Sequence, residues 1–392
     1  MTAAEVVVVG GGPAGASCAL ELARHGIPVT VVERTQFPRT KVCGEYLNAG
    51  AVAALDELRL GDLVRSLARP LRGLRLVPPD VEALELRFPA PALALERRTL
   101  DALILDAAAA AGANVVRARV DDVTFGHGRA CGVSVRDGGS EREISGRFVV
   151  GADGIGSIVA RKLGLVRAAR GRRRFAVGGH YRGFGDLGAC VEMYVGGGAY
   201  FALNPLGDDL TNVMVVVGDR QLAAWSSDVD HGVRGKAAQL ARGQRSFEGA
   251  ERIGPRLSIG PLDFSVHGVA RAGALLAGDA SGFLNPFTGQ GVALALRGGI
   301  DAARTIRQAI ESPADEHVLL ADYERRRLGE LSSRRRIATL VAALIDVPVL
   351  TRRAASRLRR DPRLAERLMT LIGAVSVPRQ PASAFVLARL LV

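Results

Sequence analysis

The hydrophobic pattern of the first forty residues predicts a strand, a helix and a second strand in close succession. Residues 6–9 are a continuous run of valines, which is typical of a strand buried on both faces in a parallel sheet. Residues 16–25 then place small and apolar side chains at helical spacing, and Gly26 stands where a helix commonly ends. A second apolar run, 28–32, predicts the next strand, which Glu33 closes.

Two later apolar runs predict further buried strands, and each leads into a motif that contains glycine and aspartate. Residues 148–150 precede Gly-Ala-Asp-Gly, in which Asp153 is the acid. Residues 274–277 precede Gly-Asp, in which Asp279 is the acid, and a glycine-rich turn then opens a helix. This second motif offers a carboxylate for a hydroxyl group and a helix N-terminus that favours a negatively charged group.

The middle of the chain alternates between short apolar runs and glycine-rich turns, which predicts a mostly antiparallel sheet. The expected strands are 174–182, 190–195, 199–203 and 211–217. Because side chains alternate along a strand, only some of the polar and aromatic ones can line a pocket. The candidates are His180, Tyr181, Tyr194, Tyr200 and Phe201. Among the histidines, His180 is the one that we would test as a base.

A helical region is predicted from residue 301 onward, with 311–392 as a C-terminal unit rich in arginine. Arginine triplets stand at 325–327 and 334–336, and a second basic stretch follows at 352–360. Two interpretations stay open. The helices either pack on the preceding domain with a solvated arginine face, or form an amphipathic surface that contacts a membrane peripherally.

Composition narrows the class of protein. The 392 residues include 52 Lys+Arg and 40 Asp+Glu, for a net charge of +12, and 48% are hydrophobic, as in a globular chain of two or three domains. Aromatic residues make up only 5%, which argues against a nucleic-acid partner. The four cysteines stand far apart, so we expect no metal site and no disulfide framework. The longest apolar stretch, 337–350, is too short to span a bilayer, and we expect a cytoplasmic protein.

The glycines between the first strand and helix form a GxGxxG motif. Gly10 permits a tight turn, Gly12 lets a pyrophosphate approach the backbone, and Gly15 lets helix and strand pack closely. The helix N-terminus stabilises phosphate, and Glu33 stands at the distance expected for an acid that binds ribose hydroxyls. The context predicts a dinucleotide site.

Together, the three glycine motifs resemble the FAD-dependent family that includes aromatic hydroxylases, geranylgeranyl reductases and flavin halogenases. The resemblance covers about residues 5–300 and lies in the order and spacing of the motifs. It implies an α/β fold whose Rossmann-like FAD-binding domain is discontinuous, followed by a C-terminal helical region. The FAD-binding domain is expected at 1–70, 97–165 and 265–310, and a mostly antiparallel substrate-binding β-sheet domain at 71–96 and 166–264.

The resemblance also implies which residues hold FAD. The GxGxxG loop and Glu33 are expected at the ADP half, Asp279 at the ribityl chain or pyrophosphate, and residues 286–291 beside the isoalloxazine, while Arg97 contacts the flavin. NADPH or NADH is expected as a transient reductant without a domain of its own. The predicted cofactor-binding residues are Gly10, Gly12, Pro13, Ala14, Gly15, Glu33, Arg34, Lys41, Cys43, Gly44, Arg97, Asp153, Gly278, Asp279, Pro286, Gly289, Gln290 and Gly291.

The segment from Lys41 to Glu45 contains a Cys-Gly pair that resembles the geranylgeranyl-reductase branch. Lys41 is expected to pair with a phosphate. Cys43 is either a reactive thiol, because Arg39 and Lys41 would favour the thiolate, or a small packing residue beside the ring. Glu45 is either an acid or positioning residue, or a carboxylate favoured by a helix start. Cys43, Glu45 and His180 are therefore the catalytic candidates.

Two reactions fit these motifs. The hydroxylase-like segment with Gln290 favours a monooxygenase that uses NAD(P)H and O2, through a C4a-hydroperoxyflavin, on a small hydrophobic or aromatic metabolite. The Cys43-Gly44 pair, and Ser281 where hydroxylases carry histidine, favour the alternative, a flavin-dependent reductase of isoprenoid (geranylgeranyl-type) double bonds. We expect a small hydrophobic substrate in either case, and a monomer or homodimer.

Overall fold

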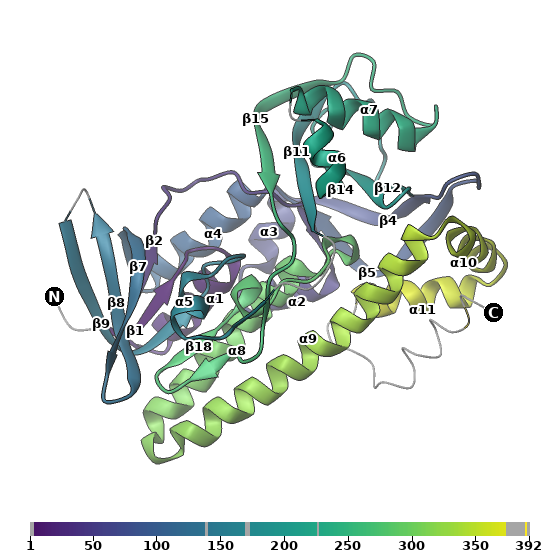
Figure 1. Cartoon of the computed structure of the whole chain (residues 1–392). Coiled ribbons are helices and arrows are strands. Elements are labelled where there is room, and N and C mark those ends of the chain that lie inside the picture. The colour runs from purple at the N-terminus through teal and green to yellow at the C-terminus, as the bar shows by residue number, and fades with distance from the viewer. Residues whose placement is uncertain (1–3, 138–139, 169–172, 226, 374–388, 390–392) are drawn as a thin grey trace.

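Two β-sheets lie next to each other, and the long helix α9 (Glu316–Asp346) runs past both of them (Figure 1). The structure is a computed structural model that describes residues 4–137, 140–168, 173–225, 227–373 and 389. The last apolar residues of the predicted C-terminal region, 374–388 and 390–392, lie outside the described residues. The predicted α/β class with a helical C-terminal region is confirmed.

The first sheet is a mostly parallel sheet in the order β17-β18-β9-β1-β2-β6. Its centre, β1, is buried on both faces, as its run of valines predicts. Helix α1 (Pro13–Arg24) follows β1 and packs on α4 (Arg97–Ala110) and α8 (Gly291–Glu311). The strands are β1 (Ala4–Val9), β2 (Val29–Glu33), β6 (Asn114–Arg117), β9 (Ser140–Gly151), β17 (Ala270–Arg271) and β18 (Ala274–Leu276), and β7 (Arg119–Gly126) and β8 (Arg129–Asp137) extend the sheet from β9.

The second sheet is mostly antiparallel, in the order β15-β11-β14-β13-β12-β4-β5-β3, with β4 and β12 parallel. Its four central strands fall where the alternating pattern predicts them. The strands are β3 (Tyr46–Leu47), β4 (Arg69–Val77), β5 (Leu84–Ala94), β11 (Arg174–Arg182), β12 (Cys190–Gly196), β13 (Ala199–Pro205), β14 (Thr211–Gly218) and β15 (Glu251–Ile259).

Shorter elements complete the described chain. The pair β10 (Val166–Arg167) and β16 (Ser265–Val266) forms a small antiparallel ladder. The remaining helices are α2 (Ala49–Glu57), α3 (Gly61–Leu67), α5 (Ile158–Lys162), α6 (Asp219–Ala224), α7 (Val229–Ala241), α10 (Pro348–Arg360) and α11 (Pro362–Gly373), with 3-10 turns at η1 (Gly278–Ser281), η2 (Pro286–Thr288) and η3 (Pro313–Asp315). Within the described chain, no helix is both long and apolar enough to cross a membrane.

The two faces of the second sheet have different partners, because side chains alternate along each strand. Tyr181, Tyr194 and Phe201 pack in a core with α7 on one face, and Tyr194 and Phe201 stack with ring centroids 4.3 Å apart. Tyr200 lies on the opposite face and packs edge-on against Phe287. Of the four aromatic candidates for a pocket, only Tyr200 therefore lies on the pocket face. The other three pack within the sheet, in agreement with the expectation that only some of the candidates line a pocket.

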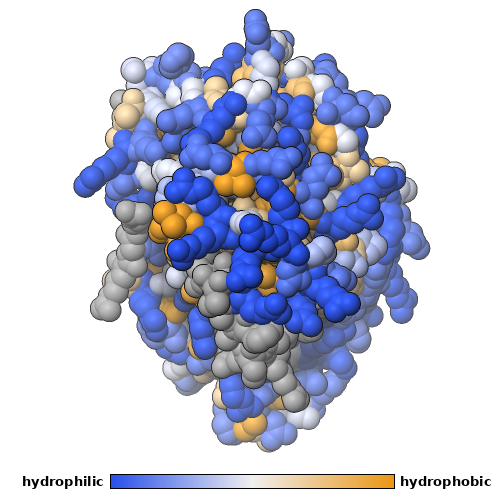
Figure 2. Space-filling model, turned by 90° about the vertical axis from the view of Figure 1, so that its right-hand side faces the viewer, coloured by the Kyte–Doolittle hydropathy of each residue, from blue (hydrophilic) through white to orange (hydrophobic). Residues whose placement is uncertain are grey.

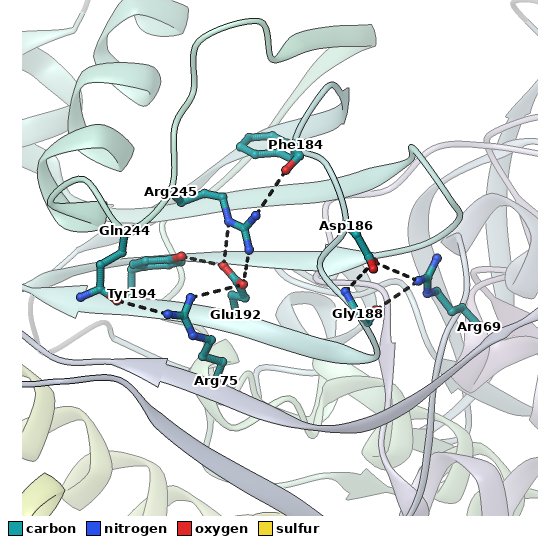
Figure 3. Close-up of polar contacts among 9 residues, drawn as sticks. All are labelled: Arg69, Arg75, Phe184, Asp186, Gly188, Glu192, Tyr194, Gln244 and Arg245. Carbon is teal, nitrogen blue, oxygen red and sulfur yellow. Dashed lines mark hydrogen bonds and ion pairs between the residues drawn. The ribbon is translucent and has the colours of Figure 1, made fainter.

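A polar network fixes the α7-side face of this sheet at β12 (Figure 3). The buried carboxylate of Glu192 accepts a hydrogen bond of 2.6 Å from the Tyr194 hydroxyl and pairs with Arg245. Arg75 lies directly opposite Glu192 in the β4–β12 register, and its Nη1 is 3.5 Å from Glu192 Oε1. Because a buried carboxylate is costly without partners, these contacts hold the register of β12 and the segment that carries Arg245 together.

Candidate functional site

A cavity of about 1030 Å³ opens between the two sheets and extends along the carboxyl edge of the first sheet. The residues that follow four of its parallel strands line one end, which is where α/β sheets commonly bind ligands. The second sheet and α11 line the other end. Sixteen of the eighteen predicted cofactor residues lie in the wall, namely Gly10, Gly12, Pro13, Ala14, Glu33, Arg34, Lys41, Cys43, Gly44, Arg97, Asp153, Gly278, Asp279, Pro286, Gly289 and Gly291.

The glycine loop after β1 has the geometry that a dinucleotide needs. Gly10 has a φ of +101°, and a Cβ there would lie 2.6 Å from the Ala152 carbonyl oxygen. A Cβ on Gly15 would lie 1.8 Å from the Gly10 carbonyl oxygen, so only glycine permits this approach of helix and strand. Gly12 faces the cavity, and a Cβ there would lie 3.5 Å from Arg39 Nη2.

Glu33 closes β2 at the same edge. Its Oε2 accepts a hydrogen bond from the Gly11 N–H at 2.8 Å, and its Oε1 accepts one from the Thr35 N–H at 2.8 Å. Burial alone would raise the pKa of Glu33, but these hydrogen bonds and the positive charge of Arg39 hold it below its ordinary value. The ionised carboxylate keeps acceptor capacity for the ribose hydroxyls that the sequence predicts.

The two other motif acids have different surroundings. Asp153 accepts hydrogen bonds from Ser157 Oγ at 2.5 Å and from the Ile158 N–H at 2.6 Å, so its carboxylate caps α5. Burial raises the pKa of Asp153 and of Asp279 above the ordinary range. Arg97 and Lys41 partly oppose this effect at Asp279. Asp279 is thus a half-buried acid that faces the cavity beside two cations.

A group of cations stands between the glycine loop and Asp279. Arg97 makes a two-point pair with the buried Asp101, at 2.7 and 2.9 Å, and Asp101 also lies 3.6 Å from Arg39. Burial lowers the pKa of Lys41, and the charges of Arg39 and Arg97 lower it further. Among the described residues no carboxylate lies within ion-pair distance of Lys41, and the buried Nε of Arg39 has no hydrogen-bond partner. The group is positioned to hold an anion.

The loop that follows this group is held in an unusual conformation. Glu45 has a φ of +55°, in the left-handed region that disfavours non-glycine residues. Its Oε1 accepts a hydrogen bond from the Arg97 N–H at 2.9 Å, at the first turn of α4, and its carbonyl oxygen accepts one from Asn204 at 3.0 Å. These contacts determine the backbone of Cys43, Gly44 and Glu45 at the cavity wall.

The second sheet supplies further partners of Glu45, and we call the contacts of Glu45 the anchor between the two sheets. Glu45 Oε2 accepts hydrogen bonds from His180 Nε2 at 2.7 Å and from Asn212 Nδ2 at 2.9 Å. Asn212 also donates to the Cys43 carbonyl oxygen, at 3.0 Å. Burial works to lower the pKa of His180, but the hydrogen bond and negative charge of Glu45 outweigh burial and raise it. His180 itself does not line the cavity, so it acts on the site through Glu45.

The three catalytic candidates therefore lie together, but the expected thiolate is not favoured. Burial raises the pKa of the Cys43 thiol, and the positive charge of Arg97 opposes burial without outweighing it. Cys43 is a protonated thiol in the cavity wall.

Two predicted cofactor residues, Gly15 and Gln290, lie outside the wall. Gly15 acts through the tight approach to Gly10. The Gln290 side chain turns away, donating to the Ile372 carbonyl oxygen at 2.6 Å and accepting from Arg334 Nη1 at 3.1 Å. The Gln290 side chain, which the sequence predicts among the cofactor residues, therefore does not line the cavity; it joins the start of α8 to the end of α11.

A buried polar chain extends from this contact to the Gly-Asp motif. Arg334 donates to Glu330 Oε1 at 3.1 Å, and Glu330 Oε2 accepts from Arg327 at 3.1 Å. Arg327 lies 3.3 Å from Ser281 Oγ, which donates to the Gly278 carbonyl oxygen at 2.6 Å. Part of the expected solvated arginine face is therefore buried in α9.

Sequence reasoning missed Asp101, Asn204 and Asn212. The two asparagines stand opposite each other in the β13–β14 register, and Asn212 stands opposite His180 in β11. A row of three polar side chains in otherwise apolar strands was the available signal, once the strand pairing is known. Asp101 follows Arg97 by four residues, the spacing of an ion pair along one helix face.

The remaining wall is apolar. No strand of the second sheet contributes a charged side chain to the cavity. Met193, Ala202 and Met214 lie in one cross-strand row, and Tyr200 and Val216 lie in the next row, away from Glu45. Met369 and Ile372 of α11 close the chamber. We call this part the apolar chamber.

These features fit FAD at the edge of the first sheet. The glycine loop leaves room for a pyrophosphate, the unpartnered Arg39 Nε and Lys41 supply positive charge, and Glu33 supplies an acceptor for ribose. A family model described as an FAD binding domain matches residues 3–331. The chain belongs to this FAD-binding family. Its resemblance to flavoproteins is thereby confirmed, and it is an FAD-dependent oxidoreductase.

Relatives in this FAD-binding family carry several activities. The chain is 32% identical to a menaquinone reductase of Mycolicibacterium smegmatis, over 77% of this chain and 76% of the relative. It is 26% identical to digeranylgeranylglycerophospholipid reductase 1 of Methanothermobacter thermautotrophicus, over 84% of this chain and 81% of the relative. A flavin-dependent brominase shares the fold with a TM-score of 0.85 at 22% identity, over 98% of this chain and 97% of that chain.

Proposed function

We propose that this flavoprotein reduces isolated double bonds in an apolar, polyprenyl-type substrate. The observation that supports the proposal is the apolar chamber, which lies in the same cavity as the residues expected to hold FAD. Its sheet wall carries methionine, valine, leucine and isoleucine side chains together with Phe88 and Tyr200, and no charged group, so it suits a hydrocarbon chain better than a charged substrate. Two of the relatives are named as reductases, and both printed compound names denote molecules that carry isoprenoid chains.

The chain's own residues divide into a cofactor end and a substrate end. Arg39 and Lys41 would bind the pyrophosphate, Glu33 the ribose, and Asp279 the ribityl chain. Bound FAD supplies hydride chemistry. Nicotinamide, as NADPH or NADH, stays the predicted reductant.

Saturation of a double bond needs a proton as well as a hydride. Cys43 Sγ keeps its proton near neutral pH because burial raises its pKa, and it faces the cavity. Glu45 is bound by three donors, so we assign it the positioning of Cys43 rather than the donation of a proton. We infer that Cys43 delivers the proton to the second carbon of the double bond.

Hydroxylation is the second candidate. Tyr200 and Phe287 stand edge to face with centroids 5.2 Å apart in the chamber, an arrangement that suits a flat aromatic substrate. Against it, Gln290, the residue that favoured a hydroxylase in the sequence, does not reach the cavity.

The deciding experiment is performed without oxygen. FAD-loaded protein is reduced chemically and mixed with geranylgeraniol, which has no quinone ring that reduced flavin could convert to a quinol. The reaction is followed by flavin absorbance and product mass. We expect flavin reoxidation and a product heavier by two hydrogens, with no reaction of the saturated analogue. Absence of reoxidation without oxygen, together with an oxygen-containing product in air, would overturn the proposal in favour of hydroxylation.

A pair of variants tests the proton donor. Cys43→Ala is expected to retain FAD and lose reduction. Cys131→Ala, which alters another half-buried thiol that does not line the cavity, is expected to retain both. If Cys43→Ala reduces the substrate at the wild-type rate, water or another group delivers the proton.

A further inference from the structure

The helices α10 and α11 concentrate positive charge on one side of the molecule. Residues 347–373 carry seven arginines against Asp361 and Glu366. On α10, Val349, Arg353 and Arg360 follow each other at helical spacing, and on α11 Arg363 and Arg367 do the same. All five are exposed, and we call the four arginines among them the basic face.

The arginines of α10 and α11 differ in their partners among the described residues. Arg352 of α10 pairs with Asp80 at 4.0 Å, and Arg359 of α10 pairs with Glu82 at 3.5 Å. In the part of the chain that the structure describes, no carboxylate lies within ion-pair distance of the four arginines of the basic face. Figure 2 views this side and shows mainly hydrophilic side chains with a few separate hydrophobic ones.

Apolar side chains stand at the border of the basic face. Val349 is 50% exposed, and Val347 just before α10 is 43% exposed. Exposed apolar residues beside arginines are typical of helices that lie in a membrane interface. Residues 347–373 contain no Phe, Tyr or Trp on which nucleic-acid bases could stack.

The cavity opens beside the same face. Thr370 lines the cavity and is exposed, and it follows Arg363 and Arg367 on one face of α11. Pro89 and Ala90 of β5 also line the cavity and are exposed. Thr370, Pro89 and Ala90 therefore border an opening of the cavity, which we call the mouth of the apolar chamber. Thr370 lies about one helical turn from Arg367.

We propose that the basic face docks on an anionic lipid bilayer and turns the mouth of the apolar chamber toward it. The guanidinium groups bind lipid phosphates with two-point geometry, and the two valines enter the interface. This proposal goes beyond the proposed reaction and rests on the distribution of charge. Membrane binding and double-bond reduction can therefore be disproved independently of each other.

The test is co-sedimentation of the FAD-loaded protein with vesicles. The vesicles contain phosphatidylcholine alone, or phosphatidylcholine with phosphatidylglycerol. We expect binding to the anionic vesicles only, with an affinity that falls as salt is added. A triple variant, Arg353→Gln with Arg363→Gln and Arg367→Gln, is expected to bind about 100-fold more weakly, since each such charge contributes about fivefold.

A control variant removes the same charge elsewhere. Arg142 of β9, Arg220 of α6 and Arg234 of α7 are exposed and lie on other elements; their replacement by Gln is expected to leave binding within about threefold of wild type. Equal binding to neutral vesicles, no binding to anionic vesicles, or equal weakening in both triple variants would overturn the proposal. Binding to double-stranded DNA as tight as to vesicles at the same salt would assign the basic face to nucleic acid instead.

Discussion

Replacement of Glu45 by alanine tests the anchor between the two sheets. The variant leaves the Arg97 N–H at the start of α4 without its acceptor, which costs about 1 kcal/mol. It removes the charge-assisted bond to His180, about 1.5–3 kcal/mol, and one of two bonds made by Asn212, about 0.5–1 kcal/mol. Alanine meets the same left-handed backbone, so that strain is unchanged. We expect the free energy of unfolding to fall by about 3–5 kcal/mol.

The same change is expected to weaken FAD binding. Glu45 determines the positions of Cys43, Gly44 and the first turn of α4, all of which face the cavity. We expect at least about a tenfold loss of affinity, or about 1.4 kcal/mol, measured by flavin fluorescence on reconstitution of the apoprotein. Urea unfolding followed by circular dichroism gives the stability.

Glu192→Ala is the matched control, because Glu192 is equally buried and equally partnered but lies on the α7-side face of the sheet. It should lose stability and keep its affinity for FAD. If Glu45→Ala matches wild type in both measurements, the anchor has no energetic role. If both variants lose FAD alike, the loss reports general destabilisation.

Three further changes have defined outcomes. His180→Gln should destabilise the fold most at pH 6. The pKa of His180 is raised in the folded protein, so protonated His180 stabilises the fold below its unfolded pKa of about 6.5, and this stabilisation is lost as the pH rises through the folded pKa. Urea midpoints that differ from wild type equally at pH 6 and pH 9 would contradict this. Gly12→Val fills the space beside Arg39 and should yield folded protein without bound flavin, so a fully yellow preparation would refute the cofactor site. Gln290→Ala removes one acceptor of Arg334 and the donor to the Ile372 carbonyl oxygen, so hydrogen exchange should become faster in α11 but not in α1. If exchange in α11 is as slow as in wild type, the Gln290 side chain does not hold α11 in place.

The first sheet and its ligand edge could be predicted from the sequence because their signals are local. A buried valine run, a glycine turn and an acid at the end of the next strand each depend on neighbours in the chain. The sequence signals for four strands of the second sheet are equally local, and the predicted bounds match β11 to β14 closely.

What the sequence could not predict depends on pairing between distant segments. Asn204 and Asn212 gain their role only because β13 and β14 place them beside Glu45. The direction of Gln290 depends on α11, more than eighty residues later. The protonated state of Cys43 depends on burial, and nearby cations in the sequence suggested the opposite state. Periodicity gives the face of a strand, but not which side chains it meets.

The bond from Gln290 to Ile372 has a mechanical consequence. Gln290 precedes the first turn of α8, whose N-terminus faces the cofactor end, and Ile372 belongs to the wall of the apolar chamber. A ligand that displaced α11 would have to stretch this bond or pull on the start of α8. We therefore expect the side-chain amide of Gln290 to couple occupancy of the chamber to the position of the α8 N-terminus.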